Sequence, residues 1–208
     1  MPENFFFTFI LQSDIMIEKF SSKRIGEERR GEMSMNVRTL VSMALLVGIG
    51  AVLHAVIPGL FAGMKPDMML AMMFLAILLF PSAKAAGIVG VATGLISAMT
   101  TTFPGGQLPN VIDKIITAFV VFALVTLLKK YSQTVIGAAV LTAVGTVISG
   151  VVFLTAVLLI VGLPGEAAFS TLFVTVVLPA AALNTVAMVI VYPIVASIFR
   201  RMNVTAHV

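Results

Sequence analysis

Residues 135–161 read VIGAAVLTAVGTVISGVVFLTAVLLIV and contain no charged side chain. The run is apolar throughout and does not alternate between apolar and polar positions, which favours an α-helix over a strand of a membrane barrel. A helix needs about 20 such residues to cross the ~30 Å hydrocarbon core of a bilayer. This stretch therefore predicts a transmembrane helix, and the fold depends on how many similar segments accompany it.

Five further apolar segments cover residues 37–57, 67–80, 83–103, 111–128 and 170–199. Segment 67–80 would extend only about 21 Å as a helix. We therefore expect either a partial or re-entrant helix there, or a helix that residues 58–66 extend. Pro179 and Pro193 each lack a backbone donor and predict kinks in segment 170–199. The whole pattern predicts an all-α membrane protein, a bundle of six transmembrane helices.

The composition excludes several classes of protein. Of the 208 residues, 60% are hydrophobic and 11% are charged, with a mean hydropathy of +1.13. Soluble domains carry about 25% charged residues, so neither a soluble enzyme nor a disordered chain fits. The sequence has no Cys, no Walker A sequence and no HExxH motif, so we expect no catalytic residues, no cofactor and no metal. Its basic residues are scattered over segment ends, so the expected surroundings are a lipid bilayer and not nucleic acid.

Residues 1–34 differ from the rest of the chain, because they hold six of its nine acidic residues. The run EERRGEM at 27–33 can be encoded by a purine-rich stretch like a bacterial ribosome-binding site before a start codon. One interpretation is a translated leader that precedes a true start at Met33 or Met35. The other is a poorly ordered cytoplasmic tail. Residues 35–208 are expected to form the six-helix transmembrane domain.

The positions of Lys and Arg predict the orientation. One side of the predicted membrane would carry Arg38, Lys84, Lys129, Lys130, Arg200 and Arg201, and the other only Lys65, with Lys114 just inside segment 111–128. The positive-inside rule makes the basic side cytoplasmic, and six spans place both termini there. Loops 58–66, 104–110 and 162–169 would then face outward. The clean separation of charge favours a full span for segment 67–80.

Two segments carry stripes of small residues at helical spacing. They are Ala44, Gly48, Ala51 and Ala55, and Ala86, Gly90, Gly94 and Ala98. Such stripes let helices approach closely in a membrane. Both stripes suit packing within the bundle. The first also suits docking of another membrane subunit, because segment 37–57 is terminal.

Three acidic residues remain in 35–208, namely Asp67, Asp113 and Glu166. A charge near bilayer depth is unfavourable and indicates a functional site. The structural alternative is helix capping, by Asp67 alone and by Asn110 with Asp113 in a pattern like a capping box. The functional interpretation is that two Gly/Pro-rich helix entries bring acids, bases, amides and free N–H groups to one face, which suits a carboxylate.

Two other polar residues allow two interpretations each. Asn184 follows Pro179 by five residues, where freed backbone groups could bind a ligand, although hydrogen bonding between helices explains it equally well. His54 lies near the outer end of segment 37–57 and is more typical of a satisfied residue between helices than of a ligand-binding one.

The motifs GMKPDMMLAMMFLAILLF at 63–80 and TTTFPGGQLPNVIDK at 100–114 resemble the bacterial tryptophan transport protein (TrpP) family. Six short helices and a small-residue first helix further resemble the S components of energy-coupling factor (ECF) transporters. The resemblance covers about residues 35–208. It implies tryptophan uptake across the bacterial cytoplasmic membrane, with capture at the outer face. It also implies an ECF coupling protein and ATPase subunits as partners.

For a tryptophan substrate, we expect Asp67 or Asp113 to meet the ammonium group. Lys65 or Lys114 would meet the carboxylate, together with free helix N–H groups. The amide contacts and the walls of an apolar indole slot are assigned to Gln107, Asn110, Asn184, Phe61, Phe103 and the methionines between 64 and 73. Packing against lipid or in the core is the alternative interpretation of those methionines, and the one that their residue type favours.

Two other functions stay open. One is a self-sufficient, ion-coupled secondary amino-acid transporter that uses Asp113 or Asp67 as its proton or sodium site. The other is a membrane scaffold subunit that transports nothing.

Overall fold

The computed structural model describes residues 35–57, 67–162 and 169–201. Both interpretations of residues 1–34 concern residues outside these ranges. The chain divides into two units, Met1–Leu40 and Val41–Val208. The described residues of the first unit begin helix α2, and the contacts reported below lie within the second unit.

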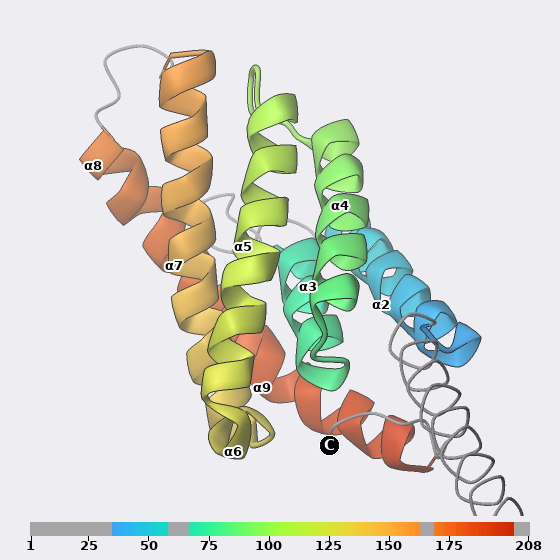
Figure 1. Cartoon of the computed structure of the whole chain (residues 1–208). Coiled ribbons are helices and arrows are strands. Elements are labelled where there is room, and N and C mark those ends of the chain that lie inside the picture. Colours follow the sequence, from blue (N-terminus) through green and yellow to red (C-terminus); the bar gives the residue numbers. More distant parts are fainter. Residues whose placement is uncertain (1–34, 58–66, 163–168, 202–208) are drawn as a thin grey trace, which may run out of the picture. The chain divides into compact units, whose positions relative to one another are not determined.

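All regular structure in the described ranges is helical (Figure 1), which confirms the all-α class. The main helices are α2 (Val37–Val56), α3 (Met68–Leu79), α4 (Ala83–Thr100), α5 (Gln107–Leu127), α7 (Val135–Ile160) and α9 (Leu178–Arg201). Shorter elements are α6 (Lys129–Ser132), α8 (Phe169–Leu172) and the π-helix η1 (Phe173–Val177). Four of the main helices, α2, α4, α5 and α7, and the continuous stretch Phe169–Arg201 are long and apolar enough to cross a membrane.

Helix α3 lies at the centre of the bundle. All 12 of its residues are buried, and it packs against α4, α5, α7 and α9. Its length of about 18 Å, at 1.5 Å per residue, is well below the ~30 Å of a hydrocarbon core. Helix α3 therefore matches a partial helix, one of the alternatives given for segment 67–80. By itself it is too short for the full membrane span that the separation of charges favoured. The stretch 58–66 lies outside the described residues.

The small residues of α4 let α5 approach it closely. A Cβ atom on Gly90 would lie 2.8 Å from Ala118 Cβ, and one on Gly94 would lie 3.2 Å from Val111 Cα. The stripe of Ala86, Gly90, Gly94 and Ala98 therefore serves packing within the bundle. Side by side, α4, α5 and α7 run in alternating directions (Figure 1).

The small residues of α2 have the opposite surroundings. Ala44, Gly48 and Ala55 are exposed, and a Cβ atom on Gly48 would meet no atom within 4 Å. The other side of α2 faces the bundle, where Gly50 lies so close to Met72 of α3 that a Cβ atom would come within 2.9 Å of Met72 Cβ. Three residues of the first stripe are therefore exposed, and its fourth, Ala51, is half-buried.

Two predicted segments have different bounds in the structure. Helix α5 begins at Gln107 and not at residue 111, because Pro109 falls in the first turn, where its missing N–H needs no partner. Segment 170–199 divides into α8, η1 and α9. The predicted disturbance at Pro179 takes the form of a π-helix that ends two residues before it, whereas Pro193 lies inside α9.

Replacing Gly90 with alanine should destabilise the bundle. We expect Gly90→Ala to lower the free energy of unfolding by about 1–3 kcal/mol, because the added methyl overpacks the contact with Ala118. Gly87→Ala is the matched control on the same helix, since its Cβ atom would meet Phe119 Cζ at an ordinary 3.5 Å. Thermal unfolding in detergent, followed by circular dichroism, measures both variants. Equal stability of the two would contradict the close approach of α4 and α5.

Candidate functional site

A cavity of about 320 Å³ opens beside the N-terminus of α3. Pockets for small molecules are typically about 300–1,000 Å³. Residues of α4, α5, α7, η1 and α9 line it, together with His54 of α2 and Asp67. Its walls are mainly apolar, and its charged groups gather at the start of α3. This combination is typical of sites that orient an amphipathic ligand.

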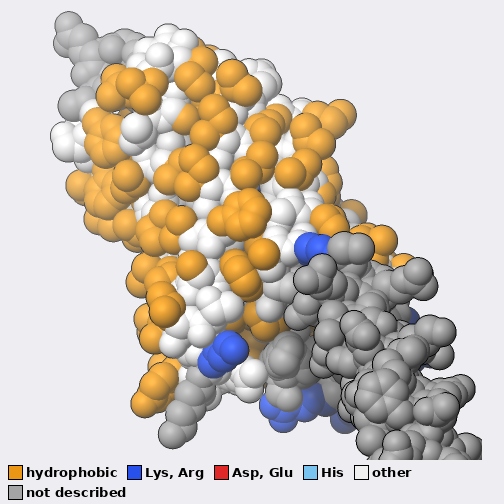
Figure 2. All heavy atoms as spheres, viewed as in Figure 1, with side chains coloured by type: hydrophobic (Ala, Val, Ile, Leu, Met, Phe, Trp, Pro, Cys, Tyr) orange, Lys and Arg blue, Asp and Glu red, His pale blue; other side chains and the backbone are white. Residues whose placement is uncertain are grey.

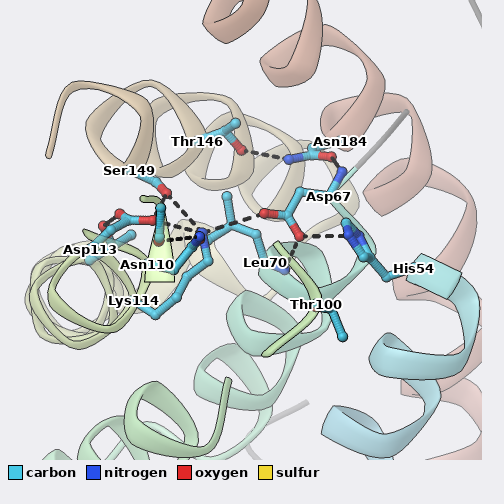
Figure 3. A network of polar contacts seen from close by, with 12 residues as sticks. His54, Asp67, Leu70, Thr100, Asn110, Asp113, Lys114, Thr146, Ser149 and Asn184 are labelled. Atoms are coloured by element: carbon cyan, nitrogen blue, oxygen red, sulfur yellow. Dashed lines mark hydrogen bonds and ion pairs between the residues drawn. The ribbon is translucent and has the colours of Figure 1, made fainter. Parts of the chain in front are cut away.

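Asp67 holds the beginning of α3 in place. Its Oδ1 atom accepts a hydrogen bond from the Leu70 N–H at 3.0 Å, so the predicted N-cap is confirmed. The Asp67 N–H donates to Asn184 Oδ1 at 2.7 Å, and Asn184 Nδ2 donates to Thr146 Oγ1 at 3.3 Å (Figure 3). The start of α3 is therefore tied to α9 and, through Asn184, to α7. The sequence offered two roles for Asn184, ligand binding and hydrogen bonding between helices. Asn184 lines the cavity, and it also makes the hydrogen bond between α9 and α7.

Asp113 lies on the buried side of α5. Its carboxylate accepts hydrogen bonds from Thr117 Oγ1 at 2.9 Å, Ser149 Oγ at 2.9 Å and Lys114 Nζ at 2.7 Å. The interpretation of Asn110 and Asp113 as a capping box is wrong, because α5 already begins after Gly106, which makes no side-chain cap. Asn110 Nδ2 instead donates to the Gly106 carbonyl at 2.8 Å.

Lys114 connects the two acids. Its Nζ atom lies 2.7 Å from Asp113 Oδ2, 3.4 Å from Asp67 Oδ2 and 3.5 Å from Ser149 Oγ. An ammonium group buried among helices needs such partners, because an unpaired charge in a low-dielectric interior is strongly unfavourable. Asp67, Asp113 and Lys114 together carry a formal charge of −1.

His54 extends the charged group to α2. Its Nδ1 atom lies 3.7 Å from Asp67 Oδ1, an ion pair when the imidazole is protonated (Figure 3). The side chains of His54 and Asp67 are 22% and 30% exposed, against 4% for Lys114 and 1% for Asp113. All four residues line the cavity, and Asp67 and His54 are the more exposed of them. The sequence had favoured an ordinary residue between helices for His54.

Two phenylalanines form an aromatic wall of the cavity. The ring of Phe103 packs edge-to-face on that of Phe153, with centroids 5.4 Å apart and planes at 85°. The wall continues along η1 to Val177, which contacts Gly150 of α7 so closely that a side chain there would clash. Single-turn π-helices occur frequently at functional sites.

Six residues assigned from the sequence line this one cavity. They are Asp67, Phe103, Asn110, Asp113, Lys114 and Asn184. Gln107 is exposed at the first residue of α5 and is not among the lining residues. Phe61 and Lys65 lie outside the described residues. The methionines of α3 do not line the indole slot as expected, because Met68, Met69, Met72 and Met73 are enclosed in the core.

The sequence reasoning missed Thr146, Ser149 and Phe153 as lining residues. They follow one another at i, i+3 and i+7 in α7, so they share a face of that helix. Two hydroxyls on one face of a long apolar run were the signal available in the sequence. Within the described ranges, no group of three or more His, Asp or Glu side chains is arranged to hold a metal ion.

Comparisons with known proteins agree with one another. The family model described as Tryptophan transporter TrpP matches residues 7–200. A "Probable tryptophan transport protein" of Bacillus subtilis (strain 168) is 56% identical over 167 residues, which cover 80% of this chain and 95% of that protein. One of the same name from Clostridium acetobutylicum is 46% identical over 160 residues, covering 77% of this chain and 92% of that protein. No solved structure matches the chain.

Removing the cation between the two acids should destabilise the protein. We expect Lys114→Met to lower the free energy of unfolding by about 3–5 kcal/mol, because Asp113 is left buried without its counter-charge. Adding Asp113→Asn should restore part of that loss. Circular dichroism during thermal unfolding in detergent compares the two variants. A double variant no more stable than Lys114→Met alone would be inconsistent with this ion pair.

Proposed function

The chain belongs to the tryptophan transporter TrpP family, and from this premise we propose that it captures free tryptophan in the cavity at the start of α3. The family is one of transporters and not of enzymes. With five stretches of its described residues able to cross a membrane, the chain is a multi-pass protein of the bacterial cell membrane. The observation that carries the proposal is the pairing of Asp67 with Lys114 beside a largely apolar cavity.

A zwitterion matches this pair of charges. Asp67 Oδ2 and Lys114 Nζ are 3.4 Å apart, and the two charged groups of an α-amino acid are also neighbours. In the proposed complex the ligand ammonium lies beside Asp67, and the ligand carboxylate lies beside Lys114. Each charge then keeps an opposite partner after water is excluded, which a buried site requires.

The two acids have different tasks in this proposal. Both oxygens of Asp113 already accept hydrogen bonds from protein groups, and its side chain is 1% exposed. It therefore positions Lys114. Asp67 is 30% exposed at the cavity and is the acid that meets the ammonium group. The sequence alone left these two acids equivalent.

The indole ring would fill the apolar part of the cavity, beside Phe103 and Phe153. Burying about 150–250 Å² of aromatic surface at ~25 cal/mol/Å² contributes roughly 4–6 kcal/mol as an upper bound. Edge-to-face contacts with the two phenylalanine rings would also orient the indole ring, which burial of apolar surface alone does not do. Charge pairing at the other end of the ligand would supply specificity for an amino acid.

We propose that the cavity opens to the outside of the cell. Thr100–Phe103, which line it, lie where α4 ends, and Asn110 lies where α5 begins. Four described basic residues, Lys84, Lys129, Arg200 and Arg201, lie at the opposite ends of these helices or at the end of α9. On the face shown in Figure 2, no described Lys or Arg lies in the upper part of the view. The positive-inside rule then favours cytoplasmic termini.

We further propose that α2 docks ECF-type coupling and ATPase partners through Ala44, Gly48, Ala51 and Ala55. Support comes from the exposure of Ala44, Gly48 and Ala55 and from the open space at Gly48. Small residues permit the close helix contact on which association in a membrane depends. The sequence contains no Walker A motif of its own.

Ion-coupled transport is the second candidate. His54, Asp67, Asp113 and Lys114 form a connected set of titratable groups inside the bundle, and such sets serve proton relays in other transporters. Uptake of tryptophan into liposomes that contain only this chain, driven by a proton or sodium gradient, would select this function over the ECF arrangement.

Asp67→Asn should weaken tryptophan binding by at least about 30-fold, because it removes one charge of an enclosed pair. Asparagine also caps helices well, so α3 should keep its N-terminus. The chain contains no Trp, so the anisotropy of indole fluorescence reports bound ligand directly. Lys129→Gln, an exposed charge at α6, is the control and should bind normally. Unchanged affinity in Asp67→Asn would refute the assignment.

Gly48→Leu should separate binding from transport. The larger side chain would prevent close docking on α2, so uptake of labelled tryptophan by cells that supply the partner subunits should be lost while binding in detergent is retained. Ile49→Phe, on another exposed side of α2, should leave uptake intact. Normal uptake by Gly48→Leu would exclude docking through this stripe.

A further inference from the structure

Several hydroxyls of this bundle donate to the backbone of their own helix. Thr100 donates to the Ile96 carbonyl at 2.9 Å, Thr142 to the Ala138 carbonyl at 2.8 Å and Thr185 to the Ala181 carbonyl at 2.6 Å. Such a bond to the carbonyl of residue i−4 is a known alternative to an outside partner for Ser and Thr in helices. A helical hydroxyl that faces a cavity without such a bond has its donor and its acceptor sites available to a ligand.

Ser97 of α4 is a hydroxyl of this kind. It is 9% exposed and lines the cavity. No hydrogen bond joins it to any residue in the part of the chain that the structure describes. The other hydroxyls deep in the cavity are engaged, since Ser149 donates to Asp113 and Thr146 accepts from Asn184. Ser97 is therefore a nearly buried polar group whose partner must come from the cavity.

The packing of α4 on α5 fixes the depth of Ser97. A Cβ atom on Gly94 would lie 3.2 Å from Val111 Cα and 3.4 Å from Lys114 Cβ. Ser97 is almost one turn further along α4, in the direction of Phe103. It thus lies between the level of the charged groups and the level of the aromatic wall. A ligand whose charged groups lie at Lys114 and whose ring lies at Phe103 would extend past Ser97.

We propose that the Ser97 hydroxyl accepts the indole N–H of tryptophan and thereby selects indole over aromatic rings that lack this donor. The inference rests on the proposed function. Indole nitrogen is a donor only, and it needs an acceptor when the ring is buried. A site built to bond such a group disfavours analogues that lack it, whereas apolar walls alone discriminate weakly.

The test compares tryptophan with 3-(1-benzothiophen-3-yl)alanine, an analogue of similar shape whose sulfur replaces the N–H group. Wild-type protein should prefer tryptophan. Ser97→Ala should weaken tryptophan binding by about 5- to 100-fold, because the N–H group is then buried without an acceptor. Binding of the analogue should stay nearly constant, so the preference should disappear. Indole fluorescence measures tryptophan, and competition measures the analogue.

Thr93→Val is the matched control. Thr93 lies one turn before Ser97 on α4, is fully buried, and its hydroxyl has no hydrogen-bond partner within the described structure. It does not line the cavity, so its loss should leave the preference for tryptophan unchanged. Ser97→Cys, with a weakly accepting sulfur, provides the same comparison if Ser97→Ala does not fold by circular dichroism.

Three outcomes would overturn the inference. If wild-type protein binds tryptophan but Ser97→Ala keeps the full preference over the analogue, Ser97 is not the acceptor, and the proposed function stands. If Asn110→Ala abolishes the preference while Ser97→Ala does not, the acceptor is the Asn110 amide oxygen. If wild-type protein binds neither compound, the proposed function fails together with the inference.

Discussion

The N-terminus of α3 is the constraint on which the rest of the structure depends. A 12-residue helix buried on all sides cannot expose its first N–H groups to water. Asp67 and Asn184 satisfy two of the backbone groups there. The cap is an acid, so its charge needs a cation, and Lys114 supplies it at 3.4 Å. Lys114 in turn is held by Asp113, which Ser149 and Thr117 support. One short helix thus requires polar groups on α5, α7 and α9.

The same groups that complete the fold also form the proposed binding site. Polar side chains inside a membrane protein are retained only where they are paired, so they gather in one place. The charged groups at the start of α3 lie inside the bundle, beside a cavity. In the proposed complex each charge of the zwitterion lies beside an opposite one. Under that proposal, Asp67 and Lys114 serve both the structure and the capture of the ligand.

The helical segments could be predicted because membrane helices form all their backbone hydrogen bonds internally and therefore appear in the sequence as continuous apolar runs. The gathering of Asp67 and Asp113 was also foreseen, since both lie near helix entries. The start of α5 was predicted too late. Residues 104–110 were expected to form a loop, yet Pro109 fits the first turn of α5. As a result, Asp113 came to lie inside the bundle and not at a cap. The methionines of α3 looked like a ligand surface, but the surrounding helices enclose them.

By itself, the sequence determined the all-helical membrane class, the small-residue stripes and the short list of charged residues that must carry function. These depend on composition and on helical periodicity, which are local properties of the chain. Only the tertiary structure decided which stripe packs inside, which acid is reachable and which hydroxyl lacks a partner. Those properties depend on contacts between residues far apart in the sequence, such as Asp67 with Asn184 or Asp113 with Ser149. No local pattern records them, because packing between helices sets the distance and the burial of each group.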